Sequence, residues 1–291
     1  MGSLLIVNPR SSRVDERVIA RVRAALPREL ELVRTERPGE ATEIAREHGG
    51  SFRAIFVLSG DGTYNEVLNG VPSGVPLGFL PGGGTSVLPR ALGLGRDPAR
   101  AAALASHGTT RRIGLGRVNG RRFAFGAGIG FDAELVRRID TRGRNAEGRR
   151  PGDLAFVRAA LGMLARGRGR LAEQLEVEGA GRAAFVLVAN CDPYTYAGRF
   201  PLRVSRGAAF ERGLALVGPC SVTGLTLPRV ALELARGVRG DGRFVVVEDA
   251  DRLVVRCDVP LALQVDGEDL GNVAGAVFEA ERDAIDVLVP G

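Results

Sequence analysis

Three short loops carry the residues whose types and spacing could do chemistry, because each combines glycine or asparagine with hydroxyl or carboxylate side chains. Their sequences are Asn8-Pro9-Arg10-Ser11-Ser12, Ser59-Gly60-Asp61-Gly62-Thr63 and Pro81-Gly82-Gly83-Gly84-Thr85-Ser86. Glycine lets the backbone lie against a ligand, and the N–H groups at the start of a following helix attract phosphate oxygens. Each loop alone could be a tight connection, but together they predict a phosphate-binding site.

Each of these loops follows an apolar run that is typical of a buried strand, at residues 4–7, 54–58 and 76–80. A further strand is expected at residues 30–33, and helices at residues 14–26, 38–47 and 63–69. Strands and helices that alternate in this way predict a parallel sheet with helices on both faces. Loops that follow parallel strands collect at the carboxyl edge of the sheet, where ligands bind.

After about residue 111 the pattern changes to many short runs that are typical of strands. Turn pairs such as Asn119-Gly120 and Asp241-Gly242 separate some of them and favour antiparallel pairing. Helices are expected only at about residues 132–139, 153–165 and 226–235. The sequence therefore predicts an α/β domain at residues 1–110 and a β-rich sandwich domain at residues 111–291.

Composition excludes several classes of enzyme. The basic side chains number 40 and all are arginine, which excludes a Walker A loop and a Schiff-base lysine. Cys191, Cys220 and Cys257 lack metal-binding spacing, and His48 and His107 are the only histidines. Serine-triad and zinc chemistries are therefore poorly supplied, and carboxylates must do most of the proton transfer.

The formal net charge is +6, with basic clusters at residues 142–150 and 166–170. An arginine-rich genome would explain this charge, and the clusters lack the interleaved aromatic residues of a single-strand binder, so no nucleic-acid partner is expected. Weak docking to an anionic membrane surface is the alternative. Because no apolar run approaches the ~20 residues that span a bilayer, we expect a cytoplasmic protein with peripheral membrane association.

A rival glycine motif occurs at Gly126-Ala127-Gly128-Ile129-Gly130. It is similar to a dinucleotide fingerprint, but Phe131 occupies the third glycine position and a hairpin precedes it instead of the start of a βαβ unit. We interpret this motif as a structural turn.

The segment Ser59-Gly60-Asp61-Gly62-Thr63-Tyr64-Asn65-Glu66-Val67 resembles the GGDGTxNEV signature of the diacylglycerol kinase catalytic family, which includes bacterial lipid kinases and sphingosine kinases. Asn8-Pro9 with Ser11 and Ser12 resembles the family's NPxSG opening. Gln264-Val265-Asp266-Gly267-Glu268 resembles its late VDGE element. The motifs occur in the expected order, so the likeness extends over most of the chain.

The resemblance implies a nucleotide-binding α/β domain joined to a β-sandwich lipid-substrate domain, with the active site in the cleft between them. It also implies ATP, Mg²⁺ and a membrane lipid acceptor such as diacylglycerol. The residues assigned to the nucleotide are Asn8, Ser11, Gly60, Asp61, Gly62, Thr63, Glu66, Gly83, Gly84 and Thr85. Asp266 would be the general base, exposed at a turn, with Glu268 beside it.

Phosphoryl transfer needs a metal ion as well as donors to the phosphate, and Asp61 and Glu66 could hold Mg²⁺ directly or through water. The chain departs from the family pattern at three places, the first being Ser59, which replaces the first glycine of the signature. Its third loop lacks the usual asparagine, and Arg212-Gly213 stands where relatives commonly have Asp-Gly near a structural Mg²⁺. Since arginine cannot ligate that ion, we expect the structural metal site to be absent.

Two other functions remain open from the sequence. An enzyme similar to NAD kinase would share the glycine loop but phosphorylate a soluble acceptor, and a non-catalytic regulatory module would bind nucleotide without turnover. Asn65-Glu66 and the turn at Asp266 favour the lipid kinase. The identity of the lipid is not specified by these residues, and a homodimer is an open alternative.

Overall fold

The computed structural model describes residues 2–141, 170–197, 200–238, 240 and 242–291. These residues form two units, Met1–Leu115 with Arg282–Gly291, and Gly116–Glu281. The first unit therefore contains a second chain segment, Arg282–Gly291. The predicted boundary at residue 110 assigned this segment to the other domain. The expected helix at about residues 153–165 and the basic clusters at 142–150 and 166–170 lie outside the described residues, apart from Arg170.

The first unit contains a sheet that begins with parallel strands. Its strands are β1 (Ser3–Val7), β2 (Leu30–Arg34), β3 (Ala54–Ser59) and β4 (Leu77–Pro81), in the spatial order β2-β1-β3-β4. All three neighbouring pairs are parallel. Every residue of β1, β3 and β4 is buried, as expected for strands covered on both faces.

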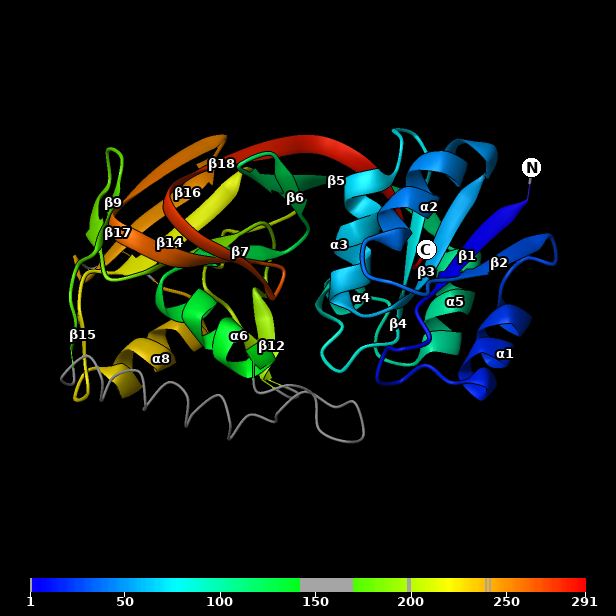
Figure 1. The fold of residues 1–291 in the computed structure, drawn as a ribbon, viewed down its shortest axis with the longest axis horizontal. Helices are drawn as coiled ribbons and strands as arrows, with labels where there is room; N and C mark the ends of the chain where they lie inside the picture. Colours follow the sequence, from blue (N-terminus) through cyan, green and yellow to red (C-terminus); the bar gives the residue numbers. More distant parts are fainter. Residues whose placement is uncertain (1, 142–169, 198–199, 239, 241) are drawn as a thin grey trace. The chain divides into compact units, whose positions relative to one another are not determined.

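Five helices belong to this unit, together with the short 3-10 turn η1 (Gly49–Ser51). They are α1 (Glu16–Ala25), α2 (Glu40–His48), α3 (Asp61–Gly70), α4 (Val87–Ala91) and α5 (Pro98–Ser106). Helix α1 packs with α5 and helix α2 with α3, and the two pairs lie on opposite faces of the sheet (Figure 1). The chain moves across the sheet from β1 to β2 and then returns past β1 to β3 and β4. With right-handed crossovers, this reversal puts the connecting helices on both faces of the sheet.

Two strands contribute residues to both units: β5 (Thr109–Val118) and β18 (Glu268–Val289). The end of β18 lies parallel to β4, with Val287 opposite Leu77. The last strand therefore extends the parallel sheet of the first unit.

The second unit is rich in antiparallel strands, with the order β16-β14-β11-β7-β17-β18. Its strands are β6 (Arg121–Phe123), β7 (Gly126–Ile129), β8 (Arg170–Leu171), β9 (Leu175–Val177), β10 (Gly181–Ala183), β11 (Val186–Ala189), β12 (Thr195–Ala197), β13 (Phe200–Leu202), β14 (Leu214–Pro219), β15 (Val222–Thr223), β16 (Phe244–Ala250) and β17 (Arg252–Val265). The prediction of a parallel α/β domain followed by a β-rich domain is confirmed.

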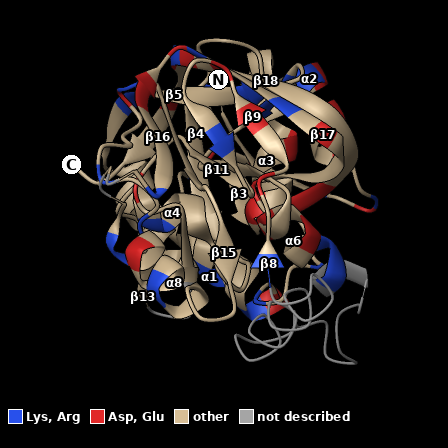
Figure 2. Cartoon of the chain, turned by 90° about the vertical axis from the view of Figure 1, so that its left-hand side faces the viewer, with Lys and Arg blue, Asp and Glu red and all other residues tan. Residues whose placement is uncertain are grey.

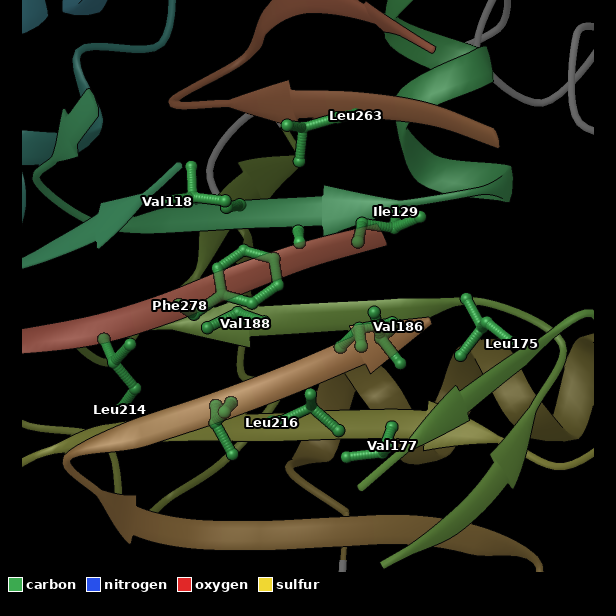
Figure 3. Close-up of a cluster of buried hydrophobic side chains, with 14 of the residues drawn as sticks. Val118, Ile129, Leu175, Val177, Val186, Val188, Leu214, Leu216, Leu263 and Phe278 are labelled. Atoms are coloured by element: carbon green, nitrogen blue, oxygen red, sulfur yellow. The ribbon is translucent and has the colours of Figure 1, made fainter. Parts of the chain in front are cut away.

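Two apolar cores hold the second unit together. Figure 3 shows the first core, where Ile129, Val186, Leu216 and Phe278 come from four different strands. The second core contains Phe185, Val217 and Phe244 and is covered by the helices α6 (Phe131–Thr141) and α8 (Leu227–Arg236). No helix among the described residues is long and apolar enough to cross a bilayer.

Candidate nucleotide loops and the buried carboxylates

The three loops predicted from the sequence lie together in the first unit, and we call them the loop cluster (residues 8–12, 59–63 and 81–86). The side-chain nitrogen Nδ2 of Asn8 donates to Oγ1 of Thr63 at 3.0 Å. The hydroxyl oxygens of Ser11 and Ser59 are 2.9 Å apart. These bonds join the loop after β1 to the loop after β3.

The loop after β4 joins the same cluster through its backbone. The N–H of Gly82 donates to the carbonyl of Ser59 at 2.6 Å, and the carbonyl of Gly82 accepts from the N–H of Arg13 at 3.0 Å. A Cβ added to Gly83 would lie only 2.8 Å from Cα of Gly60. Glycine is therefore required here because two backbones are in contact.

Gly62 and Gly84 form the open part of the loop cluster. A Cβ added to either residue would meet no atom within 4 Å. Helix α3 begins at Asp61 with Gly60 as its N-cap, and glycine has no side chain with which to cap the first N–H groups. Uncapped N–H groups at a helix start carry partial positive charge, so this backbone is suited to an anionic ligand.

The two carboxylates assigned to Mg²⁺ bond to different helices. Asp61 accepts from the N–H groups of Val87 and Leu88 at 3.2 and 3.3 Å, so it caps α4. Glu66 accepts from the N–H of Ala41 at 3.2 Å, at the start of α2. Their assignment as metal ligands stays a prediction, and this geometry does not favour one ion held by both.

The described residues contain no cluster of three or more His, Cys, Asp or Glu side chains that could hold a metal ion. The donor set therefore does not fit a protein-only Mg²⁺ site. The sequence predicted that Arg212-Gly213 does not hold a structural metal ion. In the structure, Asp249 accepts from the N–H of Gly213 at 2.7 Å and pairs with Arg212 at 3.5 Å.

Two residues that the sequence did not single out shape the loop cluster. Ser86 is buried with φ +49°, and its hydroxyl lies 3.2 Å from the N and 3.1 Å from the carbonyl oxygen of Gly83. The hydroxyl of Tyr64 lies 2.7 Å from the Ser59 carbonyl and 2.6 Å from the Leu80 carbonyl. Burial raises the pKa of Tyr64 well above its usual value, so the hydroxyl stays a neutral donor.

Asp266, the predicted general base, is buried rather than exposed, with 5% of its surface accessible. Its carboxylate accepts from the N–H groups of Ala124, Phe125 and Gly126 at 2.8, 3.0 and 3.2 Å. The expectation of an exposed carboxylate was wrong, because the link between β6 and β7 covers the turn. The role of Asp266 as a base stays a prediction.

Glu268 does not share the environment of Asp266. Its side chain is 48% exposed and pairs with Arg121 at 2.5 Å. The structure therefore places the two predicted catalytic carboxylates in different surroundings, one buried among backbone N–H groups and one at the surface.

A buried polar network beside this turn was missed by the sequence reasoning. The Oδ2 atom of Asp132 accepts from the Tyr194 hydroxyl at 2.9 Å and from Nε2 of Gln264 at 2.8 Å. Oε1 of Gln264 in turn accepts from the N–H of Gly267 at 2.9 Å. The network thus fixes the turn that carries Asp266.

The network also explains the second glycine of the rival motif. A Cβ on Gly128 would lie 2.8 Å from Oδ2 of Asp132, so only glycine leaves room for the carboxylate. Strand β7 is antiparallel to both of its neighbours, which excludes the dinucleotide-binding interpretation. Burial raises the pKa of Asp132, while the hydrogen bonds from Tyr194 and Gln264 oppose this shift.

A cavity of about 670 Å³ in the second unit contains none of the predicted site residues. Its lining includes Arg206, Val238 and Glu248. The cavity contains both signs of charge and therefore has no clear preference for an anionic ligand.

Comparisons with known proteins agree with this geometry. Residues 3–118 match the family model of the diacylglycerol kinase catalytic domain. A diacylglycerol kinase of Bacillus subtilis is 28% identical over 258 residues, covering 87% of this chain and 83% of that protein.

Solved structures show the same fold at low identity. A diacylglycerol kinase from Bacillus anthracis has a TM-score of 0.73 and 19% identity, covering 99% of this chain and 96% of that one. An NAD kinase from Archaeoglobus fulgidus in complex with ATP is more distant, with a TM-score of 0.50 and 14% identity, covering 99% of this chain and 94% of that one. The motif order and the loop cluster agree with the match of residues 3–118 to the diacylglycerol kinase catalytic domain.

Proposed function

We propose that this protein transfers the γ-phosphate of ATP to the hydroxyl of diacylglycerol or a similar membrane lipid. The observation that carries the proposal is the loop cluster, in which three loops, two of them rich in glycine, meet at the carboxyl edge of a parallel sheet. The similarity to diacylglycerol kinases supports a lipid as the acceptor.

The loop cluster is suited to hold phosphate groups through its backbone. Gly62 and Gly84 leave the backbone open, and the N-cap of α3 is Gly60, which has no side chain to occupy the helix start. Since the chain has no lysine, positive charge near the phosphates must come from arginine or a metal ion. Arg96 is one candidate, because its guanidinium donates to the carbonyl of Gly84 at 3.4 Å.

Mg²⁺, when bound with ATP, would neutralise phosphate charge and take mainly phosphate and water oxygens as ligands. Asp61 or Glu66 would contact it directly or through water. The side chains of this chain would then orient the nucleotide, with the bond between Asn8 and Thr63 keeping the first two loops in place.

Asp266 is proposed as the group that takes the proton from the lipid hydroxyl. The three backbone N–H groups orient its carboxylate and stabilise the ionised form, which is the form that accepts a proton. The bonds from Gln264 and Asp132 keep the surrounding turn rigid, so the base is held before the substrate arrives.

The test is incubation of the protein with labelled ATP, Mg²⁺ and a total membrane-lipid extract, in parallel with a reaction that contains NAD instead of lipid. We expect label in a lipid product and none in NAD, with Gly62→Val as the variant control. Label in NAD alone would replace the proposal with the NAD kinase alternative. ATP binding without any labelled product would identify a non-catalytic module.

A further inference from the structure

Helix α8 has apolar residues on two sides, which is unusual for a helix at the surface. Its inner side packs Leu227, Val230 and Leu234 against the second core of the unit. Its outer side carries Leu232, which is 47% exposed, and Leu225 in the preceding turn is 95% exposed. A surface helix normally has polar residues opposite its core-facing stripe.

The spacing of the outer residues puts them on one side of the helix. Pro228 is exposed, and Leu232 follows it by four residues, while Leu225 precedes it by three. Residues three or four apart are neighbours on a helix surface. Pro228 and Leu232 therefore lie on one side of the helix, and Leu225 lies in the turn just before it; we call these three exposed residues the α8 stripe (Leu225, Pro228 and Leu232).

The turn that carries Leu225 is tightly bonded. The N–H of Thr223 donates to Oγ1 of Thr226 at 2.8 Å, and the N–H of Thr226 lies 3.2 Å from Oγ1 of Thr223. The N–H of Thr226 also donates to the carbonyl of Thr223 at 3.1 Å. The exposure of Leu225 is thus a property of an ordered turn, and its side chain is held out into solvent.

An exposed aromatic side chain lies on a strand that contacts this helix. Phe200 is 78% exposed and begins β13, which packs against α8. Large apolar side chains that remain this exposed on contacting elements mark surfaces for a partner or a membrane.

The charges on and beside α8 favour an anionic partner. Arg229 and Arg236 lie on the helix, and Arg243 pairs with its acid, Glu233. Figure 2 shows basic and acidic segments on and beside α8. Glu233 is shared by Arg229 and Arg243 at 3.1 and 3.2 Å. Helix α8 itself carries two arginines and one glutamate, so it is positive, in agreement with the net charge of +6.

We infer that the α8 stripe and its arginines form the surface by which the protein docks on an anionic lipid bilayer. The leucine side chains would enter the boundary between headgroups and acyl chains, and the arginines would contact lipid phosphates. The inference rests on the proposed function, because a lipid kinase must reach an acceptor that stays in the membrane.

The experiment is sedimentation of the full chain with vesicles of phosphatidylcholine, with and without phosphatidylglycerol. We expect binding only with phosphatidylglycerol, and a loss of about tenfold or more for Leu225→Ser combined with Leu232→Ser, from the apolar area no longer buried. The matched control is Val259→Ser, since Val259 is 53% exposed on β17 outside the α8 stripe. Equal losses in the two variants, or binding without anionic lipid, would overturn the inference.

Arginine variants separate charge from apolar contact. Arg229→Gln with Arg236→Gln should weaken vesicle binding and reduce its dependence on salt. Arg256→Gln should not, because Arg256 lies on β17, outside the α8 stripe, where it pairs with Glu178 in the turn after β9. Circular dichroism of each variant checks that the fold is intact. If the leucine variant instead dissociates a dimer seen by analytical ultracentrifugation, the α8 stripe is an interface between copies and the membrane inference fails.

Turnover assays distinguish failure of docking from failure of the proposed function. The leucine variant should phosphorylate monomeric short-chain diacylglycerol at the wild-type rate and lose activity only on vesicle-embedded lipid. If the wild type phosphorylates neither lipid but its vesicle binding still needs Leu225, the proposed function fails and the docking surface stands. If the leucine variant and the Arg229/Arg236 variant both keep full activity on vesicle-embedded lipid, the docking surface is elsewhere.

Discussion

The loop cluster of the first unit and the turn at Asp266 in the second unit use polar groups in opposite ways. In the loop cluster, the backbone at Gly62 and Gly84 is open to solvent. At the turn, the carboxylate of Asp266 is enclosed and accepts three backbone N–H bonds. The comparison teaches that substitutions should separate function from stability in the first region and couple them in the second.

The largest effect is expected from Asp266→Asn. Loss of a general base lowers kcat by about 10²–10⁴-fold, while ATP affinity should stay nearly constant. The amide also places an NH₂ group or a weaker acceptor against the three N–H groups, so the free energy of unfolding should fall by about 1–3 kcal/mol. Steady-state kinetics and urea denaturation measure the two effects.

A variant that loses stability but keeps native turnover per folded molecule would show that Asp266 only supports the turn. If the variant remains folded and loses ATP binding, Asp266 is instead a ligand of the nucleotide or metal. Either result would require a different base.

Gly62→Val tests the open region. The valine side chain occupies the space above the backbone, so we expect ATP affinity to fall by about tenfold or more, because phosphate can no longer approach. The free energy of unfolding should change by less than about 1 kcal/mol, since an added Cβ meets no atom within 4 Å. Calorimetry with ATP and thermal unfolding make the comparison, and unchanged affinity would remove Gly62 from the site.

Gly83→Ala sharpens the contrast within the loop cluster. Its Cβ would lie 2.8 Å from the Gly60 backbone, so the loops must separate, and we expect a loss of stability of about 1–3 kcal/mol. Gly84→Ala is the matched control, because its Cβ meets nothing within 4 Å. Equal melting temperatures for the two variants would contradict the described contact.

The buried network predicts a pH effect on stability. Because burial raises the pKa of Asp132, the folded protein binds its proton more tightly than the unfolded chain. This contribution to stability is fully present below the unfolded pKa and is lost as pH rises through the folded pKa. As pH rises through the folded pKa, the free energy of unfolding should therefore fall less in Asp132→Asn than in the wild type. If urea denaturation gives the same pH dependence for both proteins, the raised pKa of Asp132 is contradicted.

Glu268→Gln should have the smallest effect. Its ion pair with Arg121 is partly exposed, and such pairs contribute about 0–1 kcal/mol to stability. We expect kcat to fall less than in Asp266→Asn, because Glu268 would only orient groups or balance charge. A loss of kcat equal to that of Asp266→Asn would assign Glu268 a direct part in catalysis.

The strands and loops of the first unit were predictable from local patterns. Fully apolar runs define β1, β3 and β4, and parallel pairing then requires their following loops to share one edge. Local sequence therefore contained enough information to place Asn8 near Thr63, 55 residues apart. The αL conformation of Ser86 was not predictable, because serine rarely adopts a positive φ.

The environment of Asp266 depends on contacts between distant segments, which local patterns do not contain. An Asp-Gly pair has the same appearance in an exposed hairpin and in a turn enclosed by residues 124–126. The buried network beside this turn also joins distant segments. Its members are Asp132 on α6, Tyr194 just before β12, and Gln264 on β17. Gly128 was nevertheless a sequence signal for this network, because a side chain at position 128 would meet the Asp132 carboxylate.

The return of β18 to the first unit has a consequence for folding during synthesis. Strand β4 pairs with β3 on one side and with Val287 of β18 on the other. While a nascent chain is still attached to the ribosome, the first unit can form β1 to β4, but the second side of β4 has no strand to pair with. An open strand edge invites pairing with other chains, so the growing polypeptide stays exposed to aggregation at β4 until β18 has been synthesised.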